Sequence, residues 1–187
     1  MPSNTLRLSA LAVALLSLVA SASVIVFETL DDMARRVPLI VRGHVARSIA
    51  GWDDQKHRIW TWTEFVVSDP IKGKPGTLVL VKQPGGEVEG IGQSVAGAAQ
   101  FREGEECVLF LEPAPDEKGA FSVSGLSAGK ISLTSWQGQP AAIRNTDGLS
   151  FAKPGSGRVE VVRSPEFLGS PEDFVKRIRA AATGGAR

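Results

Sequence analysis

The fold is decided by one stretch of alternating side chains, Arg58-Ile59-Trp60-Thr61-Trp62-Thr63-Glu64-Phe65-Val66-Val67. One face of this stretch would carry Ile59, Thr61, Thr63, Phe65 and Val67, and the other would carry Trp60, Trp62, Glu64 and Val66. A β-strand has a side-chain period of two, and β-branched and aromatic residues favour strands. The stretch therefore predicts a long β-strand with one buried face.

Further short apolar segments lie on both sides of this strand, separated by Gly, Pro and Asp. We expect Gly43 to bend the strand before it, and Asp69-Pro70 to end the central strand, because proline cannot donate to a ladder. Such segments predict a mainly β fold, an OB-like antiparallel barrel of about five or six strands over residues 39–163. The other expected strands are Leu39–Ile49, Leu78–Lys82, Glu105–Leu111, Phe121–Ser124, Lys130–Thr134, Ala142–Arg144 and Arg158–Arg163.

A short helix is expected at each end of the barrel. Thr29 can cap the first helix, near residues 30–36, and Pro38 ends it. Ser170 and Pro171 are typical of a helix start and predict a second helix at about 171–182. No internal repeat or low-complexity linker interrupts residues 23–187, so we expect them to form one domain.

The first residues have the layout of a secretory signal. Arg7 is the only charged residue before Glu28, and an uncharged run follows it from Leu8 onward. Ala20-Ser21-Ala22 has the small-residue spacing that signal peptidase cleaves. We therefore expect residues 1–22 to be removed, and the remainder to act in the periplasm or outside the cell. The alternative is an uncleaved membrane anchor, because the uncharged run extends to Phe27 and approaches the length of a spanning helix.

Composition narrows the classes of partner. One of the 21 Lys and Arg residues lies in the signal, so the mature chain has as many basic residues as its 20 acidic ones. Proteins that bind nucleic acid present a surplus of Lys and Arg to the phosphates, so we expect no nucleic-acid partner. The single cysteine, Cys107, forbids an internal disulfide, so core packing alone has to stabilise the domain.

The segment from Pro84 to Gly104 is rich in glycine and poor in bulky residues. It is too long for a hairpin turn, so we expect a defined surface loop that lies across the body of the fold. Loops carry much of the binding function of proteins, and this one supplies four candidate binding residues, Gly85, Gly86, Gly90 and Gly92.

Trp60 and Trp62 form a second candidate surface. They share a strand face with Glu64, so this face would be partly exposed to solvent. Two exposed indoles two positions apart would make a stacking platform for a sugar or for the apolar patch of a partner. The alternative is that both rings are core residues beneath the first helix or the glycine-rich loop, as large aromatic side chains usually are. Both interpretations stay open.

Motifs of catalytic sites are incomplete in this chain. Gly125-Leu126-Ser127-Ala128-Gly129 has the letters of a serine-hydrolase elbow, which needs a strand before it, a helix after it and a histidine downstream. A strand is expected after it instead, and both histidines, His44 and His57, lie upstream. We interpret the motif as a turn between two strands.

No residues have the spacing of a metal or cofactor site either. Gly129-Lys130 lacks the earlier glycine and the following Ser or Thr of a phosphate-binding loop. His44, His57 and Cys107 show none of the spacings C-x-x-C, H-x-H or H-E-x-x-H. We therefore expect no catalytic residue, no metal and no cofactor.

Several segments resemble a known family. Four segments resemble the opening strands of netrin-like domains: Val41-Arg42-Gly43-His44-Val45, Ile59-Trp60-Thr61, Phe65-Val66-Val67 and Lys72-Gly73. Netrin-like domains are the OB-type barrels of tissue inhibitors of metalloproteinases. The stretch from Pro84 to Leu111 resembles a group of exported bacterial proteins. The resemblance covers about Leu39–Leu133 and implies the barrel. The animal inhibitors chelate a protease zinc through an N-terminal cysteine, which a mature chain starting at Ser23 lacks.

The expected function is that of a non-catalytic binding or interaction module outside the cytoplasm. Its partner would be an extracytoplasmic protein or a glycan, and it would contact a membrane only if the signal stays attached. Two alternatives remain. A small secreted serine hydrolase would use Ser127 or Ser94, with His44 or His57 brought close by the fold. A structural component of the cell envelope would lack a concave apolar surface.

Overall fold

The computed structural model describes residues 23–152, 155, 158–160 and 164–184, and the expected signal peptide lies outside them. The architecture is mainly β, with two helices, α1 (Leu30–Arg36) and α2 (Pro171–Ala182), and one 3-10 turn, η2 (Leu126–Gly129). The strands are β1 (Ser23–Val26), β2 (Leu39–Trp52), β3 (Ile59–Lys72), β4 (Leu78–Pro84), β5 (Gly86–Val88), β6 (Ile91–Gln93), β7 (Glu106–Pro113), β8 (Ala120–Val123), β9 (Lys130–Trp136), β10 (Gln139–Arg144), β11 (Leu149–Ala152), β12 (Val159–Glu160) and β13 (Glu166–Phe167).

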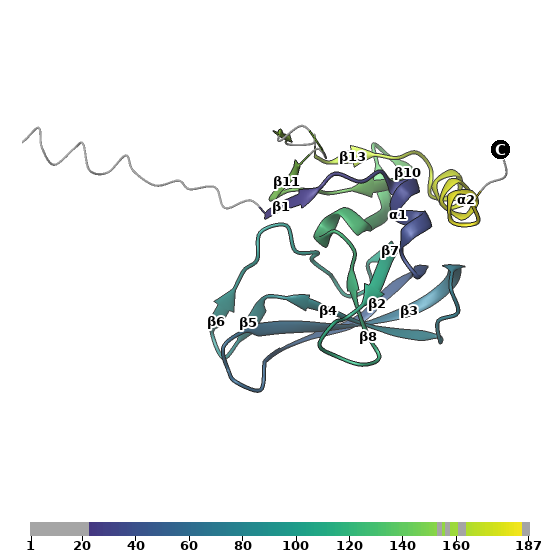
Figure 1. The fold of residues 1–187 in the computed structure, drawn as a ribbon. Coiled ribbons are helices and arrows are strands. Elements are labelled where there is room, and N and C mark those ends of the chain that lie inside the picture. The colour runs from purple at the N-terminus through teal and green to yellow at the C-terminus, as the bar shows by residue number, and fades with distance from the viewer. Residues whose placement is uncertain (1–22, 153–154, 156–157, 161–163, 185–187) are drawn as a thin grey trace, which may run out of the picture.

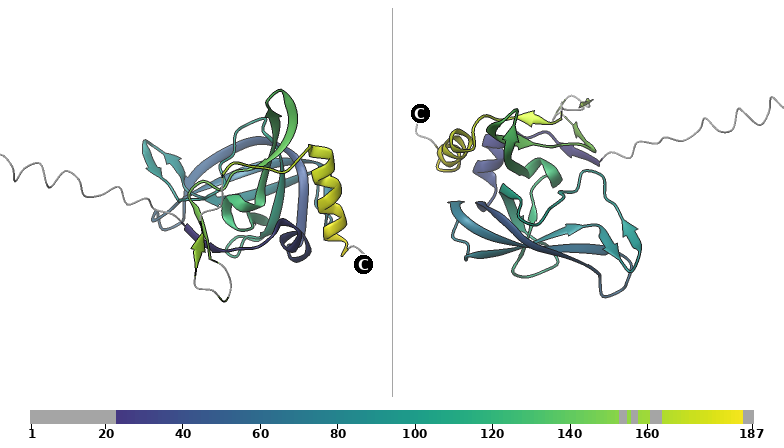
Figure 2. Two further views of the ribbon diagram at one scale, coloured as in Figure 1. Left: turned by 90° about the horizontal axis from the view of Figure 1, so that it is seen from above. Right: turned by 180° about the vertical axis from the view of Figure 1, so that it is seen from behind.

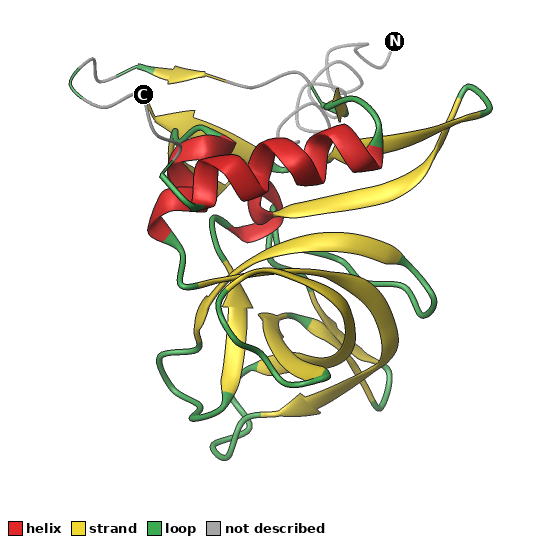
Figure 3. Ribbon diagram, turned by 90° about the vertical axis from the view of Figure 1, so that its right-hand side faces the viewer, coloured by secondary structure: helices red, strands yellow, loops and turns green. Residues whose placement is uncertain are grey.

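Five strands close into a ring. β2 pairs with β3, β3 with β4, β4 with β8, β8 with β7, and β7 again with β2. The β4–β8 pairing is parallel, so the sheet is not the wholly antiparallel one that we expected. Strands β9, β10 and β13 continue the sheet outward from β7. Figure 3 shows the ring strands curling round below the helices, and Figure 1 shows β2, β3, β4 and β8 in this lower layer.

The upper layer contains both helices and the sheet β1-β11-β12 (Figure 1). Seen from above, α2 runs along one side of this layer and β11 lies toward the opposite side (Figure 2). The helices begin as predicted. Thr29 accepts a hydrogen bond from the backbone N–H of Asp32 at 3.1 Å, and Ser170 accepts one from Asp173 at 3.1 Å. No helix in the described residues is long and apolar enough to cross a membrane.

The core has two parts because alternate side chains of β2 and β7 point to opposite sides of the sheet. Val41 and Leu109 belong to a cluster to which all five ring strands contribute, so this cluster fills the ring. Ile40 and Phe110 belong to a second cluster, which α1 and α2 share through residues such as Phe174. The helices therefore cover the outside of the ring on the β2–β7 side.

Gly43 makes the bend that we expected in β2. The register with β3 shifts between Arg42 and Gly43 and again between Val45 and Arg47. A Cβ at position 43 would lie 1.9 Å from the backbone oxygen of Val66 and 2.9 Å from the Phe65 ring. Only glycine allows the two strands to approach this closely.

The prediction that Asp69-Pro70 ends the central strand is wrong. β3 continues to Lys72, and Pro70 lies opposite Val41 of β2. The pairing of β3 with β4 reaches only from Trp60 to Val66. Pro70 therefore has a partner strand on one side alone, and its missing N–H interrupts no ladder on the other.

Some strands were not predicted. The segment expected to be a loop contains a hairpin, β5–β6, and the N-terminal strand β1 pairs in parallel with β11 through Ser23 and Leu149. β2 extends to Trp52, three residues beyond the expected end at Ile49. Of the strand expected at Arg158–Arg163, β12 is present at Val159–Glu160, and residues 161–163 lie outside the described part of the chain.

Candidate functional site

A cleft of about 730 Å³ lies on the outer surface of β3 and β4. Three of the four tryptophans of the protein line it, namely Trp52, Trp60 and Trp62, and we call it the tryptophan cleft. The remaining wall is polar. It comes from β4 and from two connections, β2–β3 and β7–β8, and contains Asp53, Asp54, Gln55, His57, Arg58, Lys82, Asp116 and Glu117.

The alternation of β3 aims two of the tryptophans at the cleft. Ile59 and Thr63 are buried, so Trp60 and Trp62 face outward from the ring. Trp52, at the end of β2, lines the same cleft. All three indoles are partly buried. Trp60 and Trp62 are therefore partly exposed at the cleft and are not fully buried core residues.

The ammonium group of Lys82 contacts the faces of two of the indole rings. Its Cα partner across the β3–β4 ladder is Trp62, and its ammonium lies 4.5 Å from the centre of the Trp60 ring and 5.5 Å from that of Trp62. An ammonium at this distance is attracted to the face of an indole. The same ammonium lies 2.9 Å from the Asp116 carboxylate and 3.2 Å from that of Glu117. Lys82 is only 8% exposed, so these groups replace water around its charge.

Charge and hydrogen bonding keep this cluster in one arrangement. Burial lowers the pKa of Lys82, but the carboxylates of Asp116 and Glu117 raise it by more, and it ends above its ordinary value. The hydrogen bond from Lys82 lowers the pKa of Asp116 below its usual value. Glu117 also accepts a hydrogen bond from the indole N–H of Trp62 at 2.9 Å. The β7–β8 connection is thereby tied to one of the rings.

Other polar groups of the cleft are unused. Within the described part of the chain, the indole N–H groups of Trp52 and Trp60 donate to no protein atom. The Asp54 carboxylate likewise has no hydrogen bond or ion pair among those residues. Asp53 accepts a hydrogen bond from the backbone N–H of His57 at 2.7 Å, which closes the β2–β3 turn. The cleft thus combines aromatic rings with free donors and free acceptors, the groups that orient a ligand.

The four candidate glycines are not among the residues that line the cleft. Gly85 donates its N–H to the backbone oxygen of Ile59 at 2.8 Å and accepts from Thr61 Oγ1 at 2.7 Å. A Cβ at Gly86 would lie 2.6 Å from Thr61 Oγ1. These two glycines therefore seat the β5–β6 hairpin against β3. Gly90 and Gly92 lie in the outer part of the hairpin, where an added Cβ would meet nothing within 4 Å.

The elbow-like motif forms a turn between two strands, as predicted. η2 is a single 3-10 turn between β8 and β9. Ser127 Oγ is buried and has no hydrogen-bond partner in the described part of the chain. Among the residues that the structure describes, neither imidazole is hydrogen-bonded to Ser127 or Ser94, and no group of three or more His, Cys, Asp or Glu residues is arranged to hold a metal.

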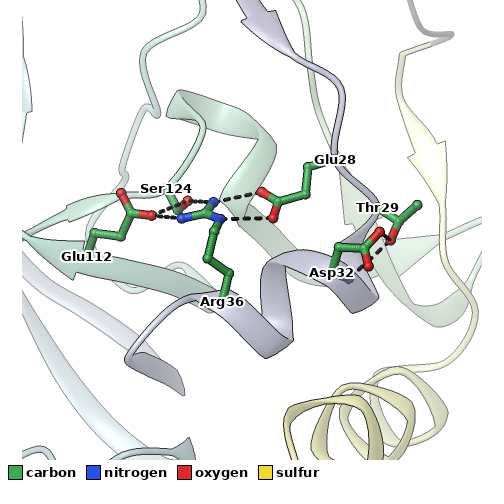
Figure 4. A network of polar contacts seen from close by, with 6 residues as sticks. All are labelled: Glu28, Thr29, Asp32, Arg36, Glu112 and Ser124. Atoms are coloured by element: carbon green, nitrogen blue, oxygen red, sulfur yellow. Dashed lines mark hydrogen bonds and ion pairs between the residues drawn. The ribbon is translucent and has the colours of Figure 1, made fainter. Parts of the chain in front are cut away.

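A second polar cluster surrounds Arg36 on α1 (Figure 4). Its guanidinium donates to both carboxylate oxygens of Glu28, at 2.9 and 2.7 Å, and to Ser124 Oγ at 2.8 Å. It also donates to Glu112 of β7. The hydrogen bonds to Glu28 are the main cause that raises the pKa of Arg36 above its ordinary value. This cluster ties α1 and the segment before it to the ring.

Among the residues that line the cleft, Trp60 and Trp62 were candidates from the sequence, whereas Trp52, Lys82 and the acidic pair on the β7–β8 connection were not. A signal for Lys82 existed, because it is a charged residue directly after the apolar run Leu78–Val81, in the same predicted strand. No protein-family model matches the chain, and no curated protein matches it. The interpretation of the tryptophan cleft therefore rests on its own geometry.

Proposed function

We propose that this protein is a non-catalytic binding module that acts outside the cytoplasm and binds its ligand in the tryptophan cleft. The observation that carries the proposal is the arrangement of Trp60 and Trp62 around the buried ammonium of Lys82. A surface that is already ordered binds without the entropy cost of fixing its side chains. The cleft is also concave and partly aromatic, which favours a binding role over a purely structural one.

The ring of strands is proposed to be an OB-like barrel. Numbered along the chain, its strands follow one another around the ring as first, second, third, fifth and fourth. OB folds bind ligands on the face of the second and third strands and on the loops that join first to second and fourth to fifth. In this protein those parts are β3, β4 and the β2–β3 and β7–β8 connections, the same parts that form the cleft. The netrin-like resemblance implies the same barrel.

Export is the remaining part of the proposal. β1 begins at Ser23, directly after Ala20-Ser21-Ala22, and the Ser23 N–H donates to the Gly148 oxygen at 3.0 Å. Because β1 belongs to the folded sheet, the uncharged run left for a spanning helix is Leu8–Ala22, which is shorter than the ~20 residues required. N-terminal sequencing of the exported protein is expected to read Ser23. A sequence that starts at Pro2 or Ser3 would support the anchored alternative.

The binding surface is tested by capture from an envelope extract. We expect the protein to retain a partner, and the double variant Trp60→Ala/Trp62→Ala to lose it. The matched control is Trp136→Ala, because Trp136 is 43% exposed and does not line the cleft. Thermal unfolding of each variant checks that the fold is intact. If the double variant unfolds, Trp60→Phe replaces it, since phenylalanine keeps the apolar contact and removes the indole.

A third variant tests the glycine-rich hairpin against the cleft. Ile91, next to Gly90 and Gly92, is 55% exposed, so Ile91→Ser changes the hairpin surface without disturbing the core. We expect this variant to retain the partner. Loss of the partner in Ile91→Ser, with retention in the tryptophan double variant, would show that the hairpin is the binding surface and that the cleft is not.

A further inference from the structure

The charge of the tryptophan cleft limits the class of ligand. Its carboxylates are Asp53, Asp54, Asp116 and Glu117, and its cations are Arg58 and Lys82. The Asp116 side chain is 50% exposed and that of Glu117 is 34% exposed, so both still face solvent at the cleft. Nucleic acids and acidic polysaccharides are held through a surplus of basic side chains. A cleft with more carboxylates than cations repels such ligands.

A cationic ligand fits no better, because its place is already taken. An ammonium is most stable over the indole rings and between two carboxylates, and Lys82 occupies that position. A ligand ammonium would have to displace Lys82 or lie beside it, where like charges repel. Asp53 is engaged by the backbone N–H of His57, which leaves Asp54 as the one carboxylate of the cleft without a protein partner in the described residues.

The unused groups of the cleft match a sugar. The C–H face of a pyranose stacks on an indole, and its hydroxyls can donate to carboxylates and accept from the free N–H groups of Trp52 and Trp60. An apolar protein patch would instead leave the carboxylates without donors, which costs binding free energy. The geometry points to an uncharged oligosaccharide as the ligand of the tryptophan cleft, an inference that rests on the proposed function and narrows it to one ligand class.

The spacing of the rings favours a chain of sugars over a single one. Trp60 and Trp62 lie on the same strand face about 7 Å apart along the strand. Trp52, at the end of β2, adds a third indole to the lining of the cleft. Successive rings of this kind suit successive units of a flexible chain, as stacked aromatic side chains do for other linear polymers. Lys82 fixes the orientation of two of the rings before the ligand arrives.

The inference is tested on the purified protein with an array of neutral and charged glycans, followed by calorimetric titration. Two matched pairs differ mainly in charge: N-acetylated and deacetylated chitohexaose, and methyl-esterified and free hexagalacturonate. We expect the array to retain neutral glycans, and each neutral member of a pair that binds to bind at least about tenfold more tightly than its charged counterpart. Raising the NaCl concentration should change the affinity by less than about twofold, because no ion pair is formed.

Variants identify the site of this binding. Trp60→Ala should weaken the affinity for the retained glycan by about fivefold or more, since a stacked aromatic ring contributes at least about that factor. Trp136→Ala should leave it unchanged, because that indole lies outside the cleft. Equal losses in both variants would show that the glycan is bound elsewhere and would overturn the inference.

The remaining outcomes separate the two proposals. Retention of charged glycans alone, or of no neutral glycan on the array, overturns the inference. If no glycan binds but the Trp60→Ala/Trp62→Ala variant still loses a protein from envelope extract, the binding module stands and its ligand is that protein. If neither glycan nor captured partner depends on the tryptophans, both the ligand class and the proposed function are wrong.

Discussion

The Lys82 cluster and the Arg36 cluster use the same chemistry for different ends. Each has one cation between two carboxylates, Asp116 and Glu117 for Lys82, and Glu28 and Glu112 for Arg36. Arg36 has no indole beside it and joins α1, the segment before α1 and β7 of the ring. Lys82 joins β4 to one connection and lies under two indoles at an open cleft. The same kind of ion pair thus joins separate elements of the fold in one region and lies beside the indole rings of the cleft in the other.

The reach of the contacts supports this distinction. Arg36 bonds to Glu112 and Ser124, which lie 76 and 88 positions away in the sequence. Lys82 bonds to Asp116, which is 34 positions away and belongs to a connection rather than a strand. Loss of Arg36 should therefore loosen the fold, and loss of Lys82 should disorder the cleft.

Arg36→Ala is expected to have the largest effect. A hydrogen bond to a charged group contributes about 1.5–3 kcal/mol when buried, and the half-exposed Arg36 side chain reduces the combined contribution. We expect the free energy of unfolding in urea to fall by about 2 kcal/mol, with ligand affinity unchanged. Arg36→Lys keeps the charge and loses the bidentate contact, so its free energy of unfolding should lie between those of the unmodified protein and Arg36→Ala. If Arg36→Ala weakened ligand binding without lowering the free energy of unfolding, the Arg36 cluster would serve the cleft and not the stability of the fold.

A second measurement on the same variant uses Cys107. This thiol lies on β7, the strand that carries Glu112, and burial raises its pKa to about 12. At about pH 8 it should react with a thiol reagent only through opening of the fold. A loss of about 2 kcal/mol would then speed labelling by about thirtyfold. Labelling that is equally slow in Arg36→Ala and in the unmodified protein would show that the Arg36 cluster does not hold β7.

Lys82→Met should have a smaller effect on stability and a larger one on binding. Methionine fills the space of the lysine stem but cannot pair with Asp116 and Glu117, which remain accessible to water. We expect the free energy of unfolding to change by about 1 kcal/mol or less and the ligand affinity to fall by about tenfold. Unchanged affinity would show that the indoles keep their orientation without the ammonium.

The two regions also differ in how far the sequence predicts them. The α1 helix that carries Arg36 was predicted from its cap at Thr29 and from Pro38, because both signals are local. The alternation that aims Trp60 and Trp62 outward was predicted for the same reason. The partners of these residues were not. Asp116 meets Lys82 only because β8 returns to close the ring beside β4, and no local pattern records a pairing between distant segments.

The errors have the same origin. Pro70 ends a strand by local rules, yet β3 continues, because its pairing with β4 ends at Val66 and leaves no ladder on that side of Pro70. The glycine-rich segment was predicted to be a loop, whereas Gly86 begins strand β5 of a hairpin, where it lies against Thr61. In both cases the deciding contact is a neighbour in space. The sequence predicts the local conformation that each segment favours, and contacts within the closed ring of strands determine whether the segment adopts it.

The smallest expected effect is that of pH on the cleft. The pKa of Asp116 is lowered by its hydrogen bond to Lys82, so its contribution is present above about pH 4 and is lost as the pH falls through the lowered value. The pKa of Lys82 is lowered by burial but raised by more through Asp116 and Glu117, so its contribution is lost only above about pH 10.4. Between these limits Lys82 and Asp116 stay charged and paired.

Tryptophan fluorescence and ligand affinity should therefore stay nearly constant between about pH 5 and 9 and change together below about pH 4. The measurement is best made on His57→Gln, so that no imidazole lies in the cleft, with circular dichroism to confirm that the fold persists in acid. Lys82→Met should lack the acid step, because the Asp116 proton would no longer compete with an ammonium. An acid step that persists in Lys82→Met would show that the pair does not control the rings, and the cleft would then resemble the Arg36 cluster after all.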